Sequence, residues 1–94
     1  MSGTRAGVFG FLCSEADHFY LGASLDIDTE IETVLEQLDR GRAMSYELQQ
    51  DWRTYGEDAF DITILEELQP PVTQGQLQQQ LEAWLTLIPY AELL

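Results

Sequence analysis

The sequence predicts a small α/β domain in which a three-stranded sheet is flanked by helices, with the elements in the order β-β-α-α-β-α. Two short aromatic runs come first, the apolar spacing changes to a helical period from Ile27, and Pro70 with Pro71 separates a last strand from a last helix. This order favours a sheet covered by helices in two or three layers. The 94 residues are expected to form one domain over 1–94, because they are too few for two cores.

The first two strands are predicted to form a hairpin. Ala6–Leu12 is apolar, and its aromatic residues Phe9 and Phe11 stand two positions apart, as in a buried strand. His18–Gly22 is a second aromatic run, close enough to pair with the first across a short turn. A third strand is predicted at Phe60–Leu65, where apolar and polar residues alternate before the run becomes apolar.

The first helix is predicted from Ile27 to Leu38. Its apolar residues recur at three-and-four spacing, and carboxylates occupy most of the remaining positions. Asp26 or Asp28 is expected to cap its first turn, where a negative charge also suits the helix dipole. Gly41 is expected to end the helix.

Two further helices carry clear end signals. One is predicted from a cap at Ser45 to Tyr55, with Gly56 as the left-handed residue that terminates it. The other begins near Thr73, which forms a capping-box pattern with Gln76. Its apolar residues share one face and are expected to pack on the sheet.

The charge balance limits the possible ligands. The chain has 17 acidic residues, four arginines and no lysine, for a formal net charge of -13. Nucleic-acid binding depends on cationic side chains that neutralise phosphates, so direct DNA or RNA binding is disfavoured. Anionic membrane surfaces are disfavoured for the same reason. Cys13 is the only cysteine, which excludes an intramolecular disulfide and, with no secretory signal pattern, favours a soluble protein in the cytoplasm.

Several blocks of residues, in the right order over nearly the whole chain, resemble the GIY-YIG nuclease superfamily. Gly7-Val8-Phe9 and Tyr20-Leu21-Gly22 are similar to the two half-motifs that give the family its name. The other similar blocks are Leu48-Gln49 with Trp52, Tyr55-Gly56-Glu57, Phe60-Asp61-Ile62 with Ile64-Leu65-Glu66-Glu67, and Trp84 in the last helix. The resemblance implies a three-stranded antiparallel sheet flanked by helices.

The resemblance also implies where catalytic residues should stand. Nucleases of this family hydrolyse a phosphodiester with one metal ion, two tyrosines, an arginine and a metal-binding glutamate, and these roles fall at Phe9, Tyr20, Glu30 and Leu81. Only Tyr20 matches. A phenyl ring cannot exchange a proton, a carboxylate repels the phosphate, and leucine binds no metal. The active site is therefore predicted to be degenerate, with no residue assigned as catalytic, no metal and no cofactor.

The leading hypothesis is a non-catalytic protein that uses an acidic surface for interaction or regulation. The acidic surface comprises Asp26, Asp28, Glu30, Glu32, Glu36 and Asp39. Its partner is expected to be a basic protein surface, and a sharper variant holds that the acidic face mimics DNA. Simpler readings stay open: Glu30 as a solvated helix residue, and Tyr20 as a core residue. The alternative is a diverged endonuclease that uses Mg²⁺ and Tyr20 with Glu82 or Glu66.

Overall fold

A computed structural model of the chain describes residues 4–94, so the first three residues of the predicted domain lie outside the described part. The backbone forms a four-stranded sheet in the order β3-β1-β2-β4, with three α-helices and one short 3-10 helix. The elements are β1 (Ala6–Cys13), β2 (His18–Ser24), α1 (Ile27–Asp39), α2 (Tyr46–Tyr55), η1 (Glu57–Ala59), β3 (Phe60–Leu68), α3 (Gln74–Leu87) and β4 (Glu92–Leu93).

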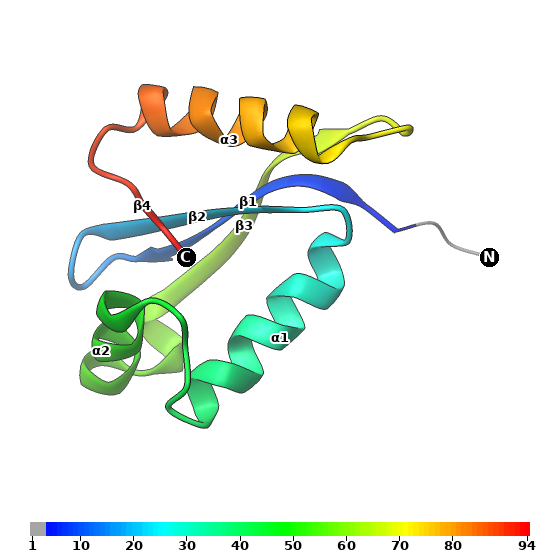
Figure 1. The fold of residues 1–94 in the computed structure, drawn as a ribbon. Coiled ribbons are helices and arrows are strands. Elements are labelled where there is room, and N and C mark those ends of the chain that lie inside the picture. The colour runs from blue at the N-terminus through cyan, green and yellow to red at the C-terminus, as the bar shows by residue number, and fades with distance from the viewer. Residues whose placement is uncertain (1–3) are drawn as a thin grey trace.

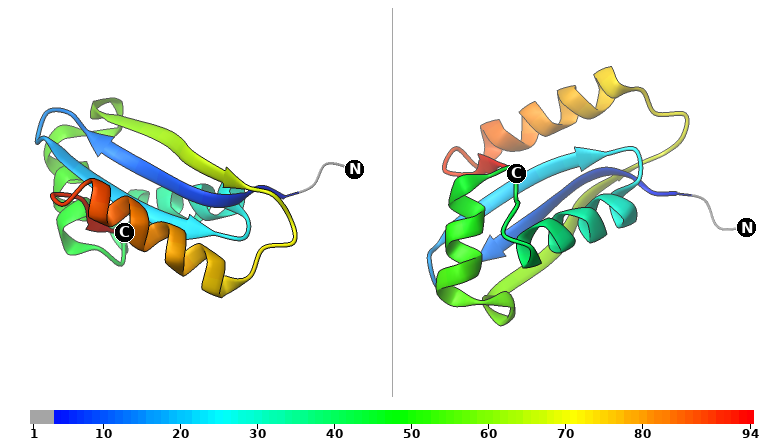
Figure 2. Two further views of the ribbon diagram at one scale, coloured as in Figure 1. Left: turned by 90° about the horizontal axis from the view of Figure 1, so that it is seen from above. Right: turned by 60° about the horizontal axis from the view of Figure 1, so that its bottom comes forward.

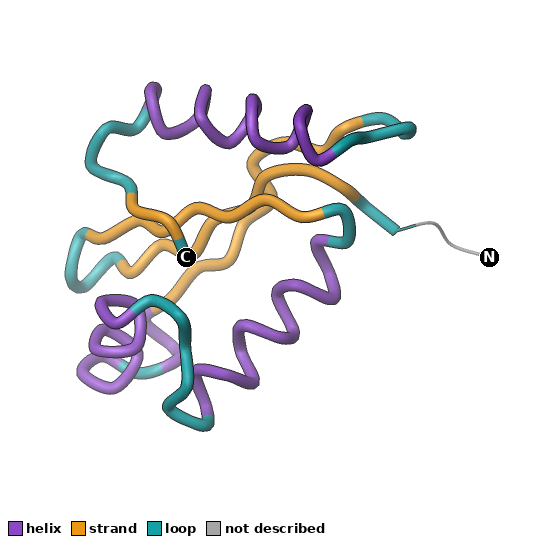
Figure 3. Tube along the Cα trace, in the orientation of Figure 1, coloured by secondary structure: helices purple, strands orange, loops and turns teal. Residues whose placement is uncertain are grey.

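The elements are arranged in three layers. Figure 1 shows α3 on one face of the sheet, with α1 and α2 on the other. Figure 2 shows the same helices from above and from below, and Figure 3 separates them from the strands and loops by colour. The expected α/β architecture of helices covering a sheet is therefore confirmed, and the number of layers is three.

The sheet differs from the predicted one in its strand count and direction. β1 pairs antiparallel with both β2 and β3, which accounts for the three predicted strands. Glu92 and Leu93 add a fourth strand, β4, which runs parallel to β2. The backbone N–H of Leu94 then donates to the carbonyl oxygen of Leu21 at 3.0 Å. The prediction of a purely antiparallel three-stranded sheet was wrong because a two-residue strand has no periodic pattern to reveal it.

Local signals set the helix ends where the sequence predicted them. Asp26 caps α1 by accepting from the backbone N–H of Thr29, and Ser45 caps α2 in the same way. Thr73 and Gln76 form the predicted capping box of α3. Gly56 follows α2 with φ of 85°, a conformation that L side chains rarely adopt. These caps satisfy backbone donors that the first turn of a helix leaves unpaired.

The main core lies between the sheet and the α1–α2 layer. Its fully or largely buried residues come from both half-motif strands and from the apolar stripes of the two helices: Phe9, Phe11, Tyr20, Ile27, Val34, Leu38 and Leu48. The rings of Phe9 and Phe11 meet edge to face with centroids 6.3 Å apart. The half-motif aromatics therefore lie at the centre of the fold. In the described part of the chain, no helix combines the length and the apolar character needed to cross a bilayer.

Candidate functional site

An open hollow lies beside β2, where α1, α3 and the end of the described chain approach the strand. Its volume is about 230 Å³. We call it the β2 hollow; its lining residues are Phe9, Leu21, Gly22, Ala23, Glu30, Leu81, Leu93 and Leu94. Three of the four positions that the family resemblance assigns to catalysis, Phe9, Glu30 and Leu81, therefore come together from β1, α1 and α3.

The side chains of the β2 hollow offer little chemistry. Glu30 is the one titratable residue among those that line it. Phe9 is only 1% exposed and has no polar atom, and Leu81 stands where the resemblance implies a metal-binding glutamate. A single carboxylate is a poor site for the divalent metal that the family uses, because such an ion needs several oxygen ligands. Across residues 4–94, no three His, Cys, Asp or Glu side chains are placed to hold a metal ion.

The end of the described chain partly fills the space beside β2. Leu94 packs against the core cluster, and a Cβ atom placed on Gly22 would lie 2.8 Å from both the Leu94 side chain and the ring of Phe9. Real Cβ atoms are not found so close to other heavy atoms. A side chain at Gly22 would therefore displace the Phe9 ring or the Leu94 side chain, both of which pack over the glycine.

Tyr20, the fourth family position, does not line the β2 hollow. Its side chain is fully buried, and its hydroxyl donates to Oδ2 of Asp51 on α2 at 2.6 Å. His18, two residues earlier on the same face of β2, places Nδ1 at 2.7 Å from the same oxygen. Asp51 is itself only 8% exposed. The three side chains form one polar cluster, which we call the Asp51 cluster, at the contact between β2 and α2.

The Asp51 cluster shifts the pKa of each of its proton donors. Burial, followed by the hydrogen bond to Asp51, raises the pKa of the Tyr20 phenol far above its ordinary value. The hydrogen bond to Asp51 raises the pKa of His18, opposed by desolvation and helped by the charges of Asp51, Glu92 and Glu47. A hydrogen bond with Glu47 also raises the pKa of Glu92 on β4. Tyr20 therefore keeps its proton near neutral pH, and little phenolate is available to act as a base.

His18 makes the stability of the fold depend on pH. Its pKa is higher in the folded state than the ordinary value of 6.5, so folding favours the protonated ring. The stabilisation is complete below about pH 6.5 and disappears as the pH rises through the folded-state pKa. We expect the free energy of unfolding of the native protein, relative to His18→Gln, to fall over that range. Urea unfolding at a series of pH values measures it, and a constant difference between the two proteins would contradict the assignment.

Only Tyr20 of the Asp51 cluster was a candidate site residue in the sequence analysis, because the members of the cluster are far apart along the chain. Tyr20 and Asp51 are separated by 31 residues. Two signals were nevertheless present. His18 and Tyr20 share one face of a strand by period two, and Asp51 follows Leu48 by three residues, which places a carboxylate on the apolar face of a helix. A carboxylate on a buried face needs a hydrogen-bond partner.

The six predicted acidic residues lie on or at the ends of α1 but do not share one face. One side of α1 carries four of these carboxylates, Asp28, Glu32, Glu36 and Asp39. Glu30 lies on a different side of the helix. An α-helix turns about 100° per residue, so Glu30 and Glu32 point about 160° apart. We call the four residues on the first side the α1 stripe. Glu30 instead faces the β2 hollow and also lines an adjoining hollow beside Met44.

Several of these carboxylates already have partners within the fold. Asp26 caps α1. Asp28 accepts two hydrogen bonds from Arg5, whose guanidinium lowers the pKa of that carboxyl. Oε1 of Glu36 lies 3.8 Å from Nη2 of Arg40. Both side chains are exposed, so this ion pair contributes little to the stability of the fold. Among residues 4–94, Glu30, Glu32 and Asp39 have no such ion pair, so they present the least neutralised charge of the predicted surface.

The carboxylates named in the nuclease alternative bond to groups other than Tyr20. Glu66 on β3 accepts from Trp84 Nε1 at 2.8 Å and from Gln80 Nε2 at 2.7 Å, which ties β3 to α3. Glu82 is exposed and accepts from Gln78 on its own helix. Both glutamates therefore make hydrogen bonds that serve the structure and do not involve Tyr20.

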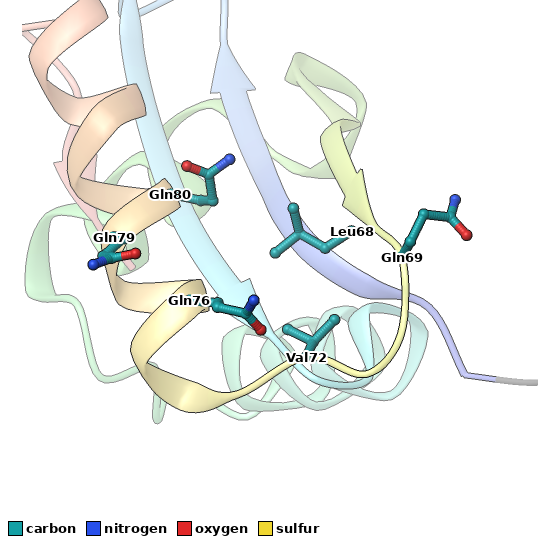
Figure 4. A pocket seen from close by; sticks show the side chains of 6 residues that line it. All are labelled: Leu68, Gln69, Val72, Gln76, Gln79 and Gln80. Carbon is teal, nitrogen blue, oxygen red and sulfur yellow. The ribbon is translucent and has the colours of Figure 1, made fainter.

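A second hollow of about 240 Å³ lies between the end of β3 and the first turns of α3. Its side chains are neutral amides and two aliphatic groups: Leu68, Gln69, Val72, Gln76, Gln79 and Gln80 (Figure 4). Gln76 and Gln80 already act in the capping box and in the bond to Glu66. The hollow has no titratable or nucleophilic side chain, so it offers no catalytic chemistry.

Comparison with known proteins identifies the fold. No family model and no curated protein sequence matches the chain. The catalytic domain of the homing endonuclease I-TevI superposes on it with a TM-score of 0.81 at 20% identity, covering 92% of this chain and 96% of that domain. A point mutant of the intron endonuclease I-TevI catalytic domain gives a TM-score of 0.80 at 20% identity, covering 92% and 86%. At this level of identity the likeness establishes the fold alone, and the chain has the GIY-YIG nuclease fold that its sequence predicted.

Proposed function

We propose that this protein is a non-catalytic member of the GIY-YIG fold that acts as an acidic protein-interaction or regulatory module. One observation carries the proposal. Phe9, Glu30 and Leu81 meet in the β2 hollow, so the place where the resemblance implies a phenol, a guanidinium and a metal ligand has one carboxylate as its titratable group. A phosphodiester entering there would meet repulsion and no cation.

The contacts of Tyr20 support the same proposal. A general base must reach the proton that it removes, and the Tyr20 hydroxyl is buried and donates its own proton to Asp51. Using it in a reaction would first require that hydrogen bond to break inside the fold. The residue is thus better explained as a support for the contact between β2 and α2.

The partner of such a surface is a basic protein surface. With a net charge of -13, the chain attracts cationic partners from a distance and repels polyanions. Glu30 and Glu32 are exposed and make no ion pair within residues 4–94. They stand on two sides of α1, so each can meet a different part of a partner. Binding of this kind is expected to weaken as salt screens the charges.

The proposal predicts a salt-sensitive complex that depends on α1. Glu30→Lys with Glu32→Lys should reduce capture of a partner from source-cell extract by about tenfold at low salt, because two attractive charges become repulsive. Glu57→Lys with Asp58→Lys is the matched control, since it makes the same charge change at two exposed residues of η1. Quantitative mass spectrometry of the captured proteins measures both. Equal loss in both variants would show that only net charge matters and would count against a dedicated surface.

A nuclease assay tests the proposal from the other side. Purified protein is expected to leave plasmid and branched DNA intact in the presence of Mg²⁺ or Mn²⁺. Cleavage that depends on the metal and disappears in Tyr20→Phe would overturn the proposal in favour of the diverged nuclease. Cleavage that survives in Tyr20→Phe would indicate a contaminating enzyme.

A further inference from the structure

One part of the β2 edge has no neighbouring strand within the described residues. β2 pairs with β1 along its whole length, up to Ser24 opposite Gly7. On its other side, β4 pairs with Tyr20 and Leu21 only, and the bond from Leu94 to Leu21 closes that ladder. Residues 22–24 therefore continue past the end of β4 as an open edge.

The backbone of Ala23 faces this open edge. The carbonyl of Leu21 points toward β4, since it accepts the bond from Leu94. Backbone polar groups of a strand repeat their direction every second residue, so the N–H and C=O of Ala23 point to the same side. Within residues 4–94, no other segment bonds to them there. Ala23 also lines the β2 hollow, so the unpaired groups lie in a space that another chain can enter.

The two walls of the β2 hollow differ in character. Glu30 on α1 supplies a carboxylate on one side of the sheet, and Leu81 on α3 supplies an apolar side chain on the other. The side chains of a strand alternate between the two faces of its sheet. A strand added beside Ala23 would therefore direct one residue toward Glu30 and the next toward Leu81.

We propose that the β2 hollow binds an extended segment of a partner protein, in which basic and apolar residues alternate, as an added strand in line with β4. The proposal rests on the proposed function and gives its partner a definite form. An arginine or lysine pairs with Glu30, an apolar residue packs on Leu81, and the main chain of the segment pairs with Ala23. Strand addition of this kind takes affinity from the backbone and specificity from alternate side chains.

Charge decides between a peptide and a nucleic acid as the occupant. A single strand of DNA or RNA would bring phosphates toward Glu30, with no cationic side chain among the lining residues to neutralise them. A basic peptide brings the opposite charge and the backbone donors and acceptors that an open strand edge requires. We therefore assign a peptide to the β2 hollow.

A defined peptide tests the assignment. The probe is a fluorescein-labelled hexapeptide of alternating arginine and valine, titrated with the complete protein at low salt and followed by fluorescence polarisation. Methylating every second backbone amide of the same peptide keeps its charge and removes donors for strand pairing. Two methylated peptides are made, one with the odd-numbered amides methylated and one with the even-numbered amides methylated. We expect one of the two to bind about tenfold more weakly than the parent, which corresponds to the loss of one or two backbone hydrogen bonds.

Protein variants locate the binding. Glu30→Lys should weaken the arginine–valine peptide by about tenfold, whereas Glu57→Lys, the same change at an exposed residue of η1, should alter it by less than about twofold. Ala23→Pro removes the edge N–H and should also weaken binding, with Ala23→Ser as the variant that keeps it. Amide shifts of residues 22–24 in NMR spectra of the unmodified protein check the location if Ala23→Pro does not fold.

The outcomes separate this inference from the function on which it rests. Equal binding of both methylated peptides and the parent, or equal sensitivity to Glu30→Lys and Glu57→Lys, would leave an acidic interaction protein but overturn strand addition in the β2 hollow. Absence of binding by the basic peptide would also overturn it, while partner capture by the native protein would keep the proposed function. Tighter binding of a labelled oligothymidylate than of the peptide would overturn both.

Discussion

Asp51→Ala is expected to destabilise the protein by about 3 kcal/mol. The carboxylate accepts hydrogen bonds from Tyr20 and His18, and the alanine would leave the fully buried Tyr20 hydroxyl without an acceptor. An orphaned buried hydroxyl costs roughly 1–3 kcal/mol, and a bond to a charged group contributes about as much. The better helix propensity of alanine offsets about half a kcal/mol of the loss.

Chemical denaturation near neutral pH measures this effect, and two further variants establish its cause. Asp61→Ala changes an exposed carboxylate on β3 and is expected to stay within about 0.5 kcal/mol of the native protein. Tyr20→Phe combined with Asp51→Ala removes the hydroxyl as well as its acceptor, so its cost should be smaller than the sum of the two single changes. Simple additivity would show that the Asp51 cluster is not the source of the stability.

Gly7→Ala is expected to destabilise the protein by about 3 kcal/mol or more, to the point of preventing folding. A Cβ atom at Gly7 would collide with the backbone oxygen of Glu66. That oxygen belongs to the neighbouring strand, just before the register shift between β1 and β3, and cannot rotate away like a side chain. The clash would push β3 from β1 and disturb the bonds that join Glu66 to α3.

Gly75→Ala provides the control for this change, and it is expected to change the stability of the protein in the opposite direction. Gly75 lies in the first turn of α3, where the nearest atom to a new Cβ is 3.8 Å away. Alanine there is expected to stabilise the protein by about 0.5–1 kcal/mol, through a lower backbone entropy in the unfolded chain. Thermal unfolding of both variants measures the contrast. A mild effect of Gly7→Ala would mean that the two strands approach each other less closely than described.

The sequence predicted those parts of the fold that local chemistry determines. Ser45 and Thr73 cap helices because of their own side chains, and Gly56 ends α2 because of its own backbone freedom. The hairpin was also predictable, since aromatic runs with period two lie on either side of a short turn. Each of these features can be recognised within about a dozen residues.

The remaining features depend on contacts between distant parts of the chain. β4 forms because residues 92–93 meet β2, and nothing in those two residues predicts a strand. Asp51 reaches Tyr20 only once α2 is placed against the sheet. The placement of Glu30 and Glu32 on opposite sides of α1 does not depend on such distant contacts. It could have been predicted from the sequence, because the rotation per residue of a helix is known. The predicted acidic surface groups all the carboxylates of α1 together. The helix instead places them on two sides.

The bond from Leu94 to Leu21 has a practical consequence for anyone who labels or immobilises this protein. Any residue joined after Leu94 would emerge beside Gly22 and Ala23, since Leu94 itself lines the β2 hollow. A purification tag or fluorophore attached there would compete with the peptide that we propose for the β2 hollow and would make its measured affinity too weak. Fusions for binding measurements therefore belong ahead of Thr4, and a label joined directly after Leu94 is better used as a reporter of occupancy of the β2 hollow.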